Sequence, residues 1–237
     1  MQVYISNKEI VEIAEGLVQH FSGGSPPKMV DIDGIARHIG LTVTYEALAE
    51  KEQDKIAFLS DGIRPLAVYR DKEPTLLIFP KDTVVLDKFL LRSEEETRRR
   101  FALAHEVGHK LIFLTDPTQQ SACFDTLHDS ERSYTTEDLR ERLTFAESQA
   151  TAMGATILMT PTMINAALKK YHRDKLIPVY GDGVFHPKTK TALHHMAAML
   201  GVSHSALLIQ LRKYGLLEKH DLSEFIVKHL AGGGDSQ

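Results

Sequence analysis

The chain of 237 residues contains a single cysteine, Cys123. One thiol cannot form an internal disulfide, so the sequence does not suggest a secreted domain stapled by disulfides. No run approaches the ~20 consecutive apolar residues that a membrane-spanning helix needs. The first ten residues also lack the basic start and apolar stretch of a signal peptide. We therefore expect a cytoplasmic protein that makes no membrane contact.

An excess of positive charge is missing as well. The formal net charge is −4, so no overall basic field favours a nucleic-acid partner. Hydrophobic residues make up 43% of the chain and charged residues 25%, which is the balance of an ordinary globular protein with a buried core. We find no internal repeat and no low-complexity segment.

The hydrophobic periodicity predicts a helix over residues 6–21, begun by a capping box of Ser6 and Glu9. A short helix over 32–39 and a strand over 41–45 follow. Between residues 55 and 89 the pattern changes to short β-rich segments separated by the turn pairs Asp61-Gly62 and Asp71-Lys72. We interpret these as a meander of three or four strands, formed by residues 56–60, 64–70, 74–80 and 83–91.

A long helix is predicted from Ser93 to Leu114, with Ser93 and Glu96 as a second capping box. Three acid–base pairs at i,i+4 spacing support it, and they indicate that the run Arg98–Arg100 is a solvated helical face and not a nucleic-acid contact. Further helices are predicted over residues 137–158, 162–171, 190–200 and 204–214. Residues 117–134 should form a loop, and residues 173–189 a loop or short hairpin.

Residues 104–109 of this helix read Ala-His-Glu-Val-Gly-His. His105 and His109 are four residues apart and therefore lie on one face, where both imidazoles can reach one ion at ~2.0–2.1 Å. Glu106 projects beside the pair, and its carboxylate can deprotonate a water molecule at the metal. Gly108 removes a side chain next to the ligands, at a cost of ~1 kcal/mol relative to alanine. The pattern predicts a metallopeptidase with one Zn²⁺ per chain.

A catalytic zinc usually has three protein ligands and one open position. Glu147 is the best third ligand because it borders the buried stripe of the next long helix. Small residues follow it on the same side and would let the two helices approach closely. The other candidates for this ligand are His128, Asp129, Glu131 and Glu141. Donors that could stabilise the oxyanion are His128, Tyr134 and His172, and the sequence does not choose among them.

Two segments, RRRFALAHEVGHKLIF and ESQATAMGATILMTP, together resemble the ImmA/IrrE family of bacterial and phage metallopeptidases. The preceding DKIAFLSDGIRPLAVYR and FPKDTVVLDKFLL resemble the N-terminal half of that family, so the resemblance covers residues 30–215. It implies a zincin-like fold with His105, His109 and Glu147 as zinc ligands and Glu106 as general base. The chain departs from the family pattern at Gln149, where many members have a second glutamate, and at Thr160, which stands between Met159 and Pro161.

The resemblance also implies a function: zinc-dependent, site-specific hydrolysis of a peptide bond in a helix-turn-helix repressor, in mobile-element or stress regulation. An extended substrate could add to an edge strand of the meander, for which the strand with Leu76, Ile78 and Phe79 is the candidate. Two alternatives stay open. The chain could be a non-catalytic regulator that binds a repressor or DNA and has a vestigial metal site, or a toxin–antitoxin component.

Residues 193–215 resemble a helix-turn-helix with Gly201 near the turn. The second helix has few base-reading side chains in its first turns, so we expect this module to pack on the peptidase or dock the substrate; direct DNA binding is less favoured. The fold class predicted is α+β. Residues 1–160 should form a zincin-like metallopeptidase domain with a small antiparallel or mixed sheet, residues 161–231 a helical, helix-turn-helix-like module, and residues 232–237 a disordered tail.

Overall fold

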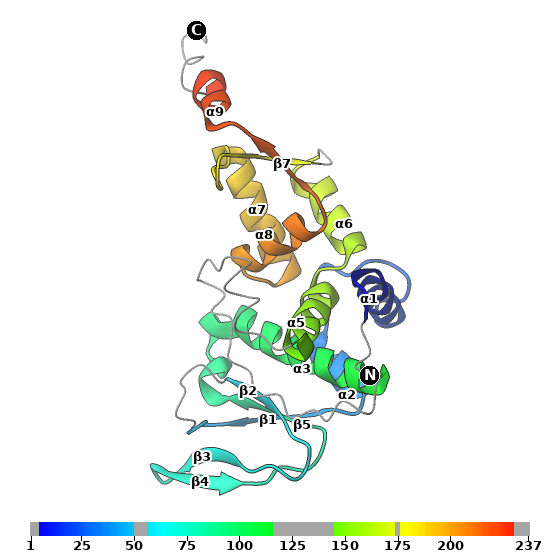
Figure 1. Ribbon diagram of the computed structural model, residues 1–237, viewed down its shortest axis with the longest axis vertical. Coiled ribbons are helices and arrows are strands. Elements are labelled where there is room, and N and C mark those ends of the chain that lie inside the picture. Colours follow the sequence, from blue (N-terminus) through cyan, green and yellow to red (C-terminus); the bar gives the residue numbers. More distant parts are fainter. Residues whose placement is uncertain (1–4, 50–55, 116–144, 174–175, 230–237) are drawn as a thin grey trace.

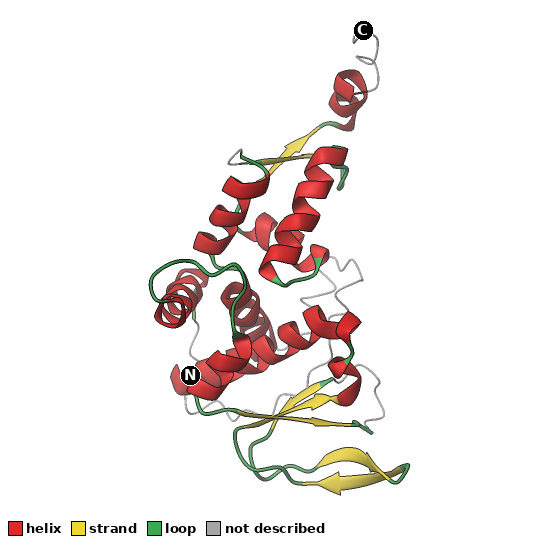
Figure 2. Ribbon diagram, turned by 180° about the vertical axis from the view of Figure 1, so that it is seen from behind, coloured by secondary structure: helices red, strands yellow, loops and turns green. Residues whose placement is uncertain are grey.

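A small mixed sheet with helices on one face and a β-hairpin on the other forms one half of the molecule (Figures 1 and 2). The computed structural model describes residues 5–49, 56–115, 145–173 and 176–229. Helices and strands are combined as the α+β prediction requires. Cys123, the first part of the helix predicted over 137–158, and the predicted tail 232–237 lie outside the described residues.

The sheet has the strand order β1-β5-β2. β5 (Thr83–Asp87) pairs in parallel with β1 (Thr42–Glu46) and antiparallel with β2 (Ala57–Leu59). β3 (Leu66–Arg70) and β4 (Glu73–Leu77) form a separate hairpin. The predicted meander is therefore wrong. β5 is buried along most of its length and pairs with a strand on each edge, and the β3–β4 hairpin is inserted in the chain between β2 and β5.

Alternation along the central strands divides the core between the two faces of the sheet. Ala57, Leu59, Val84 and Leu86 belong to the main core under the helices. Phe58 and Val85 point to the opposite face and pack with Leu66 and Val68 of the hairpin. Side chains of a strand point alternately to its two faces, so both faces of this sheet are covered.

The hairpin between β3 and β4 closes through a two-residue turn at Asp71 and Lys72. Asp71 and Lys72 both have positive φ, 51° and 72°. Two such residues make a type I′ turn, whose twist matches that of the flanking strands. The turn predicted at Asp71-Lys72 is confirmed. The predicted strand over 74–80 is too long, because β4 ends at Leu77 and leaves Ile78 and Phe79 beyond it.

The helices over the sheet begin with α1 (Asn7–Ser22), whose predicted capping box is confirmed in both directions. α2 (Ile32–His38) follows, and α3 (Glu96–Thr115) crosses the sheet. The short 3₁₀ turns η1 (Lys88–Leu91) and η2 (Ser93–Glu95) lead into α3. The predicted capping box at Ser93 is wrong, since Ser93 is itself the first residue of η2 and its hydroxyl lies 3.3 Å from the Glu94 carboxylate.

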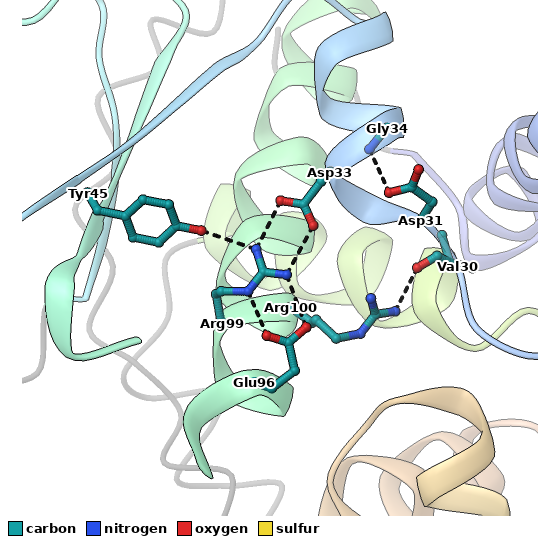
Figure 3. A network of polar contacts seen from close by, with 8 residues as sticks. All are labelled: Val30, Asp31, Asp33, Gly34, Tyr45, Glu96, Arg99 and Arg100. Carbon is teal, nitrogen blue, oxygen red and sulfur yellow. Dashed lines mark hydrogen bonds and ion pairs between the residues drawn. The ribbon is translucent and has the colours of Figure 1, made fainter. Parts of the chain in front are cut away.

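Arg99 is partly buried and is the centre of a polar network that links several elements (Figure 3). Its guanidinium donates to both oxygens of Asp33, at 2.9 and 3.0 Å, and to both oxygens of Glu96, at 3.0 and 2.8 Å. It also donates to the Tyr45 hydroxyl at 3.2 Å. These bonds hold the pKa of Asp33 below its ordinary value. The network ties α3 to α2 and β1, which a reading of local i,i+4 pairs could not predict.

Arg100 is buried and connects distant parts of the chain. Its Nη2 donates to the Val30 carbonyl at 2.8 Å, as Figure 3 shows, and its Nε donates to the Gly201 carbonyl at 3.1 Å. Arg98 pairs with Glu95 at i,i+3 spacing and lies over the Phe89 ring. The prediction of a solvated Arg98–Arg100 face is thus wrong, because Arg99 and Arg100 bind groups that are remote in sequence.

The second half of the chain is mainly helical, as predicted. It contains α5 (Phe145–Leu158), α6 (Pro161–Tyr171), α7 (Pro187–Leu200), α8 (His204–Lys213) and α9 (Leu222–His229). The region predicted as a loop or hairpin contains β6 (Ile177–Tyr180), which pairs in parallel with β7 (Leu217–His220). α7 and α8 are bent by 98° about a turn in which Gly201 has φ +66°.

One continuous buried cluster joins the two predicted domains. It runs from Ile5 to Leu211 and includes side chains of α3, α5, α7 and α8. The boundary predicted at residue 160 stays a prediction, but both sides of it contribute to the same core. Within the described residues, no single helix is long and apolar enough to cross a membrane, and α7 with α8 reaches that length and composition only as a bent pair.

Candidate metal centre

Two glycines bring α3 and α5 into backbone contact. A Cβ atom added to Gly108 of α3 would lie 2.5 Å from the Ala150 carbonyl oxygen of α5. A Cβ atom added to Gly154 of α5 would lie 2.7 Å from the Ala104 carbonyl oxygen of α3. Only the absence of a side chain at both positions permits this approach. It brings side chains of the two helices at this crossing within reach of one another.

Three ligand atoms meet where the helices cross. The Nε2 atoms of His105 and His109 are 2.8 Å apart, and Oε2 of Glu147 lies 3.2 Å from the first and 3.3 Å from the second. All three residues are buried, with exposed fractions of 3%, 5% and 6%. They are the group among the described residues whose ligand atoms could hold a metal ion.

The donor set fits a divalent ion. Two imidazole nitrogens and one carboxylate oxygen are the protein ligands of a common class of catalytic zinc site. Donors placed at tetrahedral angles around zinc would be about 3.4 Å apart. The separations of 3.2 and 3.3 Å are close to this value, and that of 2.8 Å between the imidazoles is somewhat shorter. The three donors require little rearrangement to surround an ion.

Thr151 orients the first histidine. It lies one turn after Glu147 on α5, and its Oγ1 is 3.2 Å from Nδ1 of His105. When Nδ1–H donates to this hydroxyl, the lone pair of Nε2 is left free to face His109 and Glu147. The sequence predicts only that the residues after Glu147 on this side are small; the i+4 spacing of Thr151 from Glu147 is the signal that could have revealed this contact.

Replacement of Thr151 by valine should weaken zinc binding by about tenfold, because a partner that fixes the ring of a ligand typically contributes that much. Thr151→Ser keeps the hydroxyl and should bind zinc like the wild type. A competition titration with a chromophoric chelator measures both dissociation constants. Equal affinity in the valine and serine variants would contradict the positioning role.

Glu106 directly follows His105 and is fully buried, with an exposed fraction of 0%. Successive helical residues are separated by about 100° around the axis, so Glu106 faces the flank of the ligand pair and not α5. One turn later, Lys110 is held by Asp82, at 2.7 Å from its carboxylate. Glu106 thus lies on the α3 face between the ligand pair and the sheet.

The remaining predicted site residues have different positions. His128, Asp129, Glu131, Tyr134 and Glu141 lie outside the described residues. The structure does not bring His172 into the ligand group: it caps the end of α6, and its ring is 3.2 Å from the Leu176 carbonyl. The ring of His172 is therefore bonded within the segment that follows α6.

The two residues that depart from the pattern of the ImmA/IrrE family, which the sequence resembles, have structural roles here. Gln149 is buried and donates from Nε2 to the Ile5 carbonyl at 2.8 Å, which fastens the segment before α1 to α5. Thr160 is the N-cap of α6, where its hydroxyl accepts from the Met163 amide at 3.3 Å and Pro161 occupies the first turn. Neither residue contributes to the ligand group.

Comparisons with known proteins assign no family to this chain, so the inference of its function rests on the geometry of the metal centre. No protein-family model matches the chain, and no curated protein matches it.

Proposed function

We propose that the chain is a cytoplasmic, zinc-dependent endopeptidase that cleaves a helix-turn-helix repressor at a defined site. The observation that carries the proposal is the buried group of His105, His109 and Glu147, with Glu106 immediately after the first ligand. Closed structural zinc sites use four protein ligands, whereas this group offers three from the described residues. A purely structural site would also have no need of a buried carboxylate beside it.

The chain's own residues supply the proton transfers of peptide hydrolysis. Zinc, when bound, would polarise the scissile carbonyl and lower the pKa of water. Glu106 accepts the proton of the attacking water and then returns it to the leaving amine. Its burial keeps this carboxylate in a medium of low dielectric, where its interactions with the reacting atoms are stronger than in bulk water.

The strand β2 is better placed than β4 to hold an extended substrate. β2 is an edge strand of its sheet and packs against α3, whereas β4 belongs to the hairpin on the opposite face. The Ile56 carbonyl and the Ser60 amide bond to β5, so the backbone groups of Ala57 and Leu59 point away from it. We therefore transfer the substrate-binding role from the strand with Leu76 to β2.

The test uses as substrate any helix-turn-helix protein whose gene is found beside the gene of this chain. Zinc-loaded protein should cut it once, 1,10-phenanthroline should stop the cut, and added zinc should restore it. Electrophoresis and mass spectrometry of the products locate the bond. A complex of the two proteins that forms without any cleavage in the presence of zinc would contradict the peptidase and favour a regulator that only binds.

The 98° bend between α7 and α8 favours a helix-turn-helix-like module, as a second element of the proposal. Gln210, the amide side chain of α8, is not available to DNA bases, because it is buried and donates to Tyr214 and Thr156, at 2.7 and 3.3 Å. Exposed side chains of α8 include Ile209 and Arg212. We propose that this module docks the protein substrate and does not read DNA.

A further inference from the structure

A pocket of about 330 Å³ lies between β2 and the C-terminal half of α3. Leu59 and Ser60, at the end of β2, form one wall. Lys110 and Phe113 of α3 also line the pocket, together with Lys81, which precedes β5. The pocket is therefore lined both by the end of the edge strand that we assign to the substrate and by the helix that carries the metal ligands.

The pocket is on the side of α3 that faces the proposed reaction. Phe113 follows His109 by four residues and Glu106 by seven, so it lies one turn beyond the second ligand and two turns beyond the general base on the same face. Leu59 is the last residue of β2. A peptide paired with β2 would pass the mouth of this pocket within a few residues of the bond at the metal.

The walls are built before any ligand binds. The Ser60 hydroxyl donates to the Phe79 carbonyl at 2.7 Å and accepts from the Gly62 amide at 3.1 Å. The Ser60 carbonyl accepts from the Asp82 amide at 2.9 Å. These bonds hold the turn after β2 against the segment before β5. A site held in this way loses little conformational entropy when it binds.

The charges in the pocket leave one lysine without an acidic partner. Asp82 pairs with Lys110 at 2.7 Å, and Asp61 lies 3.5 Å from Arg64. Asp61 also accepts the amides of residues 63 and 64, at 2.8 and 2.9 Å. Lys81 is the remaining cation: its ammonium lies 5.6 Å from the centre of the Phe113 ring, and no carboxylate of the described residues pairs with it.

We propose that this pocket binds an acidic side chain of the peptide substrate, with its carboxylate on Lys81 and its methylene groups against Leu59 and Phe113. The lining has three cationic and two acidic side chains, so it carries one net positive charge that an aspartate or glutamate neutralises. A basic side chain would meet like charge. This inference rests on the proposed peptidase function, because it takes the substrate to lie along β2.

Peptide selection on the zinc-loaded Glu106→Gln variant of the full chain tests the proposal. A pool of short, acetylated and amidated peptides of random sequence is passed over the immobilised variant, and the retained peptides are sequenced. We expect aspartate and glutamate to be enriched over lysine and arginine at one position by about tenfold, the ratio that corresponds to one charge-assisted hydrogen bond. Higher ionic strength should reduce this ratio.

Adding Lys81→Glu should remove or reverse the enrichment, while Lys28→Glu, which makes the same charge change at an exposed residue outside the pocket, should leave it intact. Retained peptides without acidic enrichment, or an enrichment that Lys81→Glu leaves unchanged, would overturn the assignment of the pocket. Cleavage of the same pool by the wild-type protein is measured separately. Acid-selective retention without cleavage would count against the peptidase alone.

Discussion

Glu106→Gln is expected to lower the rate of peptide cleavage by about 10³-fold, within the range that a general base contributes. The amide cannot accept the proton of the attacking water, but it has almost the same shape as the carboxylate. Zinc content, measured by mass spectrometry after dialysis, should remain at one ion per chain. The kcat should therefore fall while the metal stays bound.

Two further variants separate this effect from loss of the metal or of the fold. Glu147→Gln removes the carboxylate whose oxygen lies 3.2 and 3.3 Å from the two imidazoles, so it should lose zinc as well as activity. Glu73→Gln, at an exposed position of β4, should change neither. Cleavage by Glu106→Gln at the wild-type rate would exclude Glu106 as the base.

Gly108→Val should destabilise the protein and weaken its zinc site together. Because an added Cβ would lie 2.5 Å from the Ala150 carbonyl oxygen, a larger side chain must push α3 and α5 apart. Overpacking of this kind costs about 1–3 kcal/mol of the free energy of unfolding, more than the fraction of a kcal/mol that valine gains over glycine in helix propensity. Separation of the helices also draws Glu147 away from His105 and His109.

Urea unfolding of the metal-free protein measures the packing effect, and a chelator competition measures the zinc affinity. The metal-free measurement is needed because bound zinc adds stability by mass action. Gly16→Ala on α1 is the matched control: its added Cβ meets no atom within 4 Å, so it should stabilise the protein by up to ~1 kcal/mol. Unchanged stability and zinc affinity in Gly108→Val would contradict the close helix crossing.

Local features of the fold could be predicted from the sequence because neighbouring residues form them. The Ser6–Glu9 capping box and the turn at Asp71-Lys72 each depend on a few consecutive side chains and their backbone angles. The strand pairing could not be predicted in the same way. β5 pairs with β1 across about forty residues, and β6 pairs with β7 across a similar distance, so neither contact leaves a local pattern.

The arginine run shows the same limit within a single helix. Glu94, Glu95 and Glu96 precede Arg98–Arg100 at helical spacing, which favours solvated ion pairs when only local contacts are considered. Arg99 binds Asp33 as well as the local Glu96, and Arg100 binds the carbonyls of Val30 and Gly201. The long side chain of arginine allows its guanidinium to bind groups of other helices and strands. The local sequence does not show which of these elements pack beside it.

The sequence by itself determined that His105 and His109 share one helical face with Glu106 beside them, since the spacing of residues on a helix requires it. It also named Glu147 as the best third ligand, although four other residues remained as candidates. Only the tertiary structure brought Glu147 to the imidazoles and Thr151 to His105. The physical reason is the crossing of α3 and α5 at Gly108 and Gly154, where two backbones touch because no side chain keeps them apart.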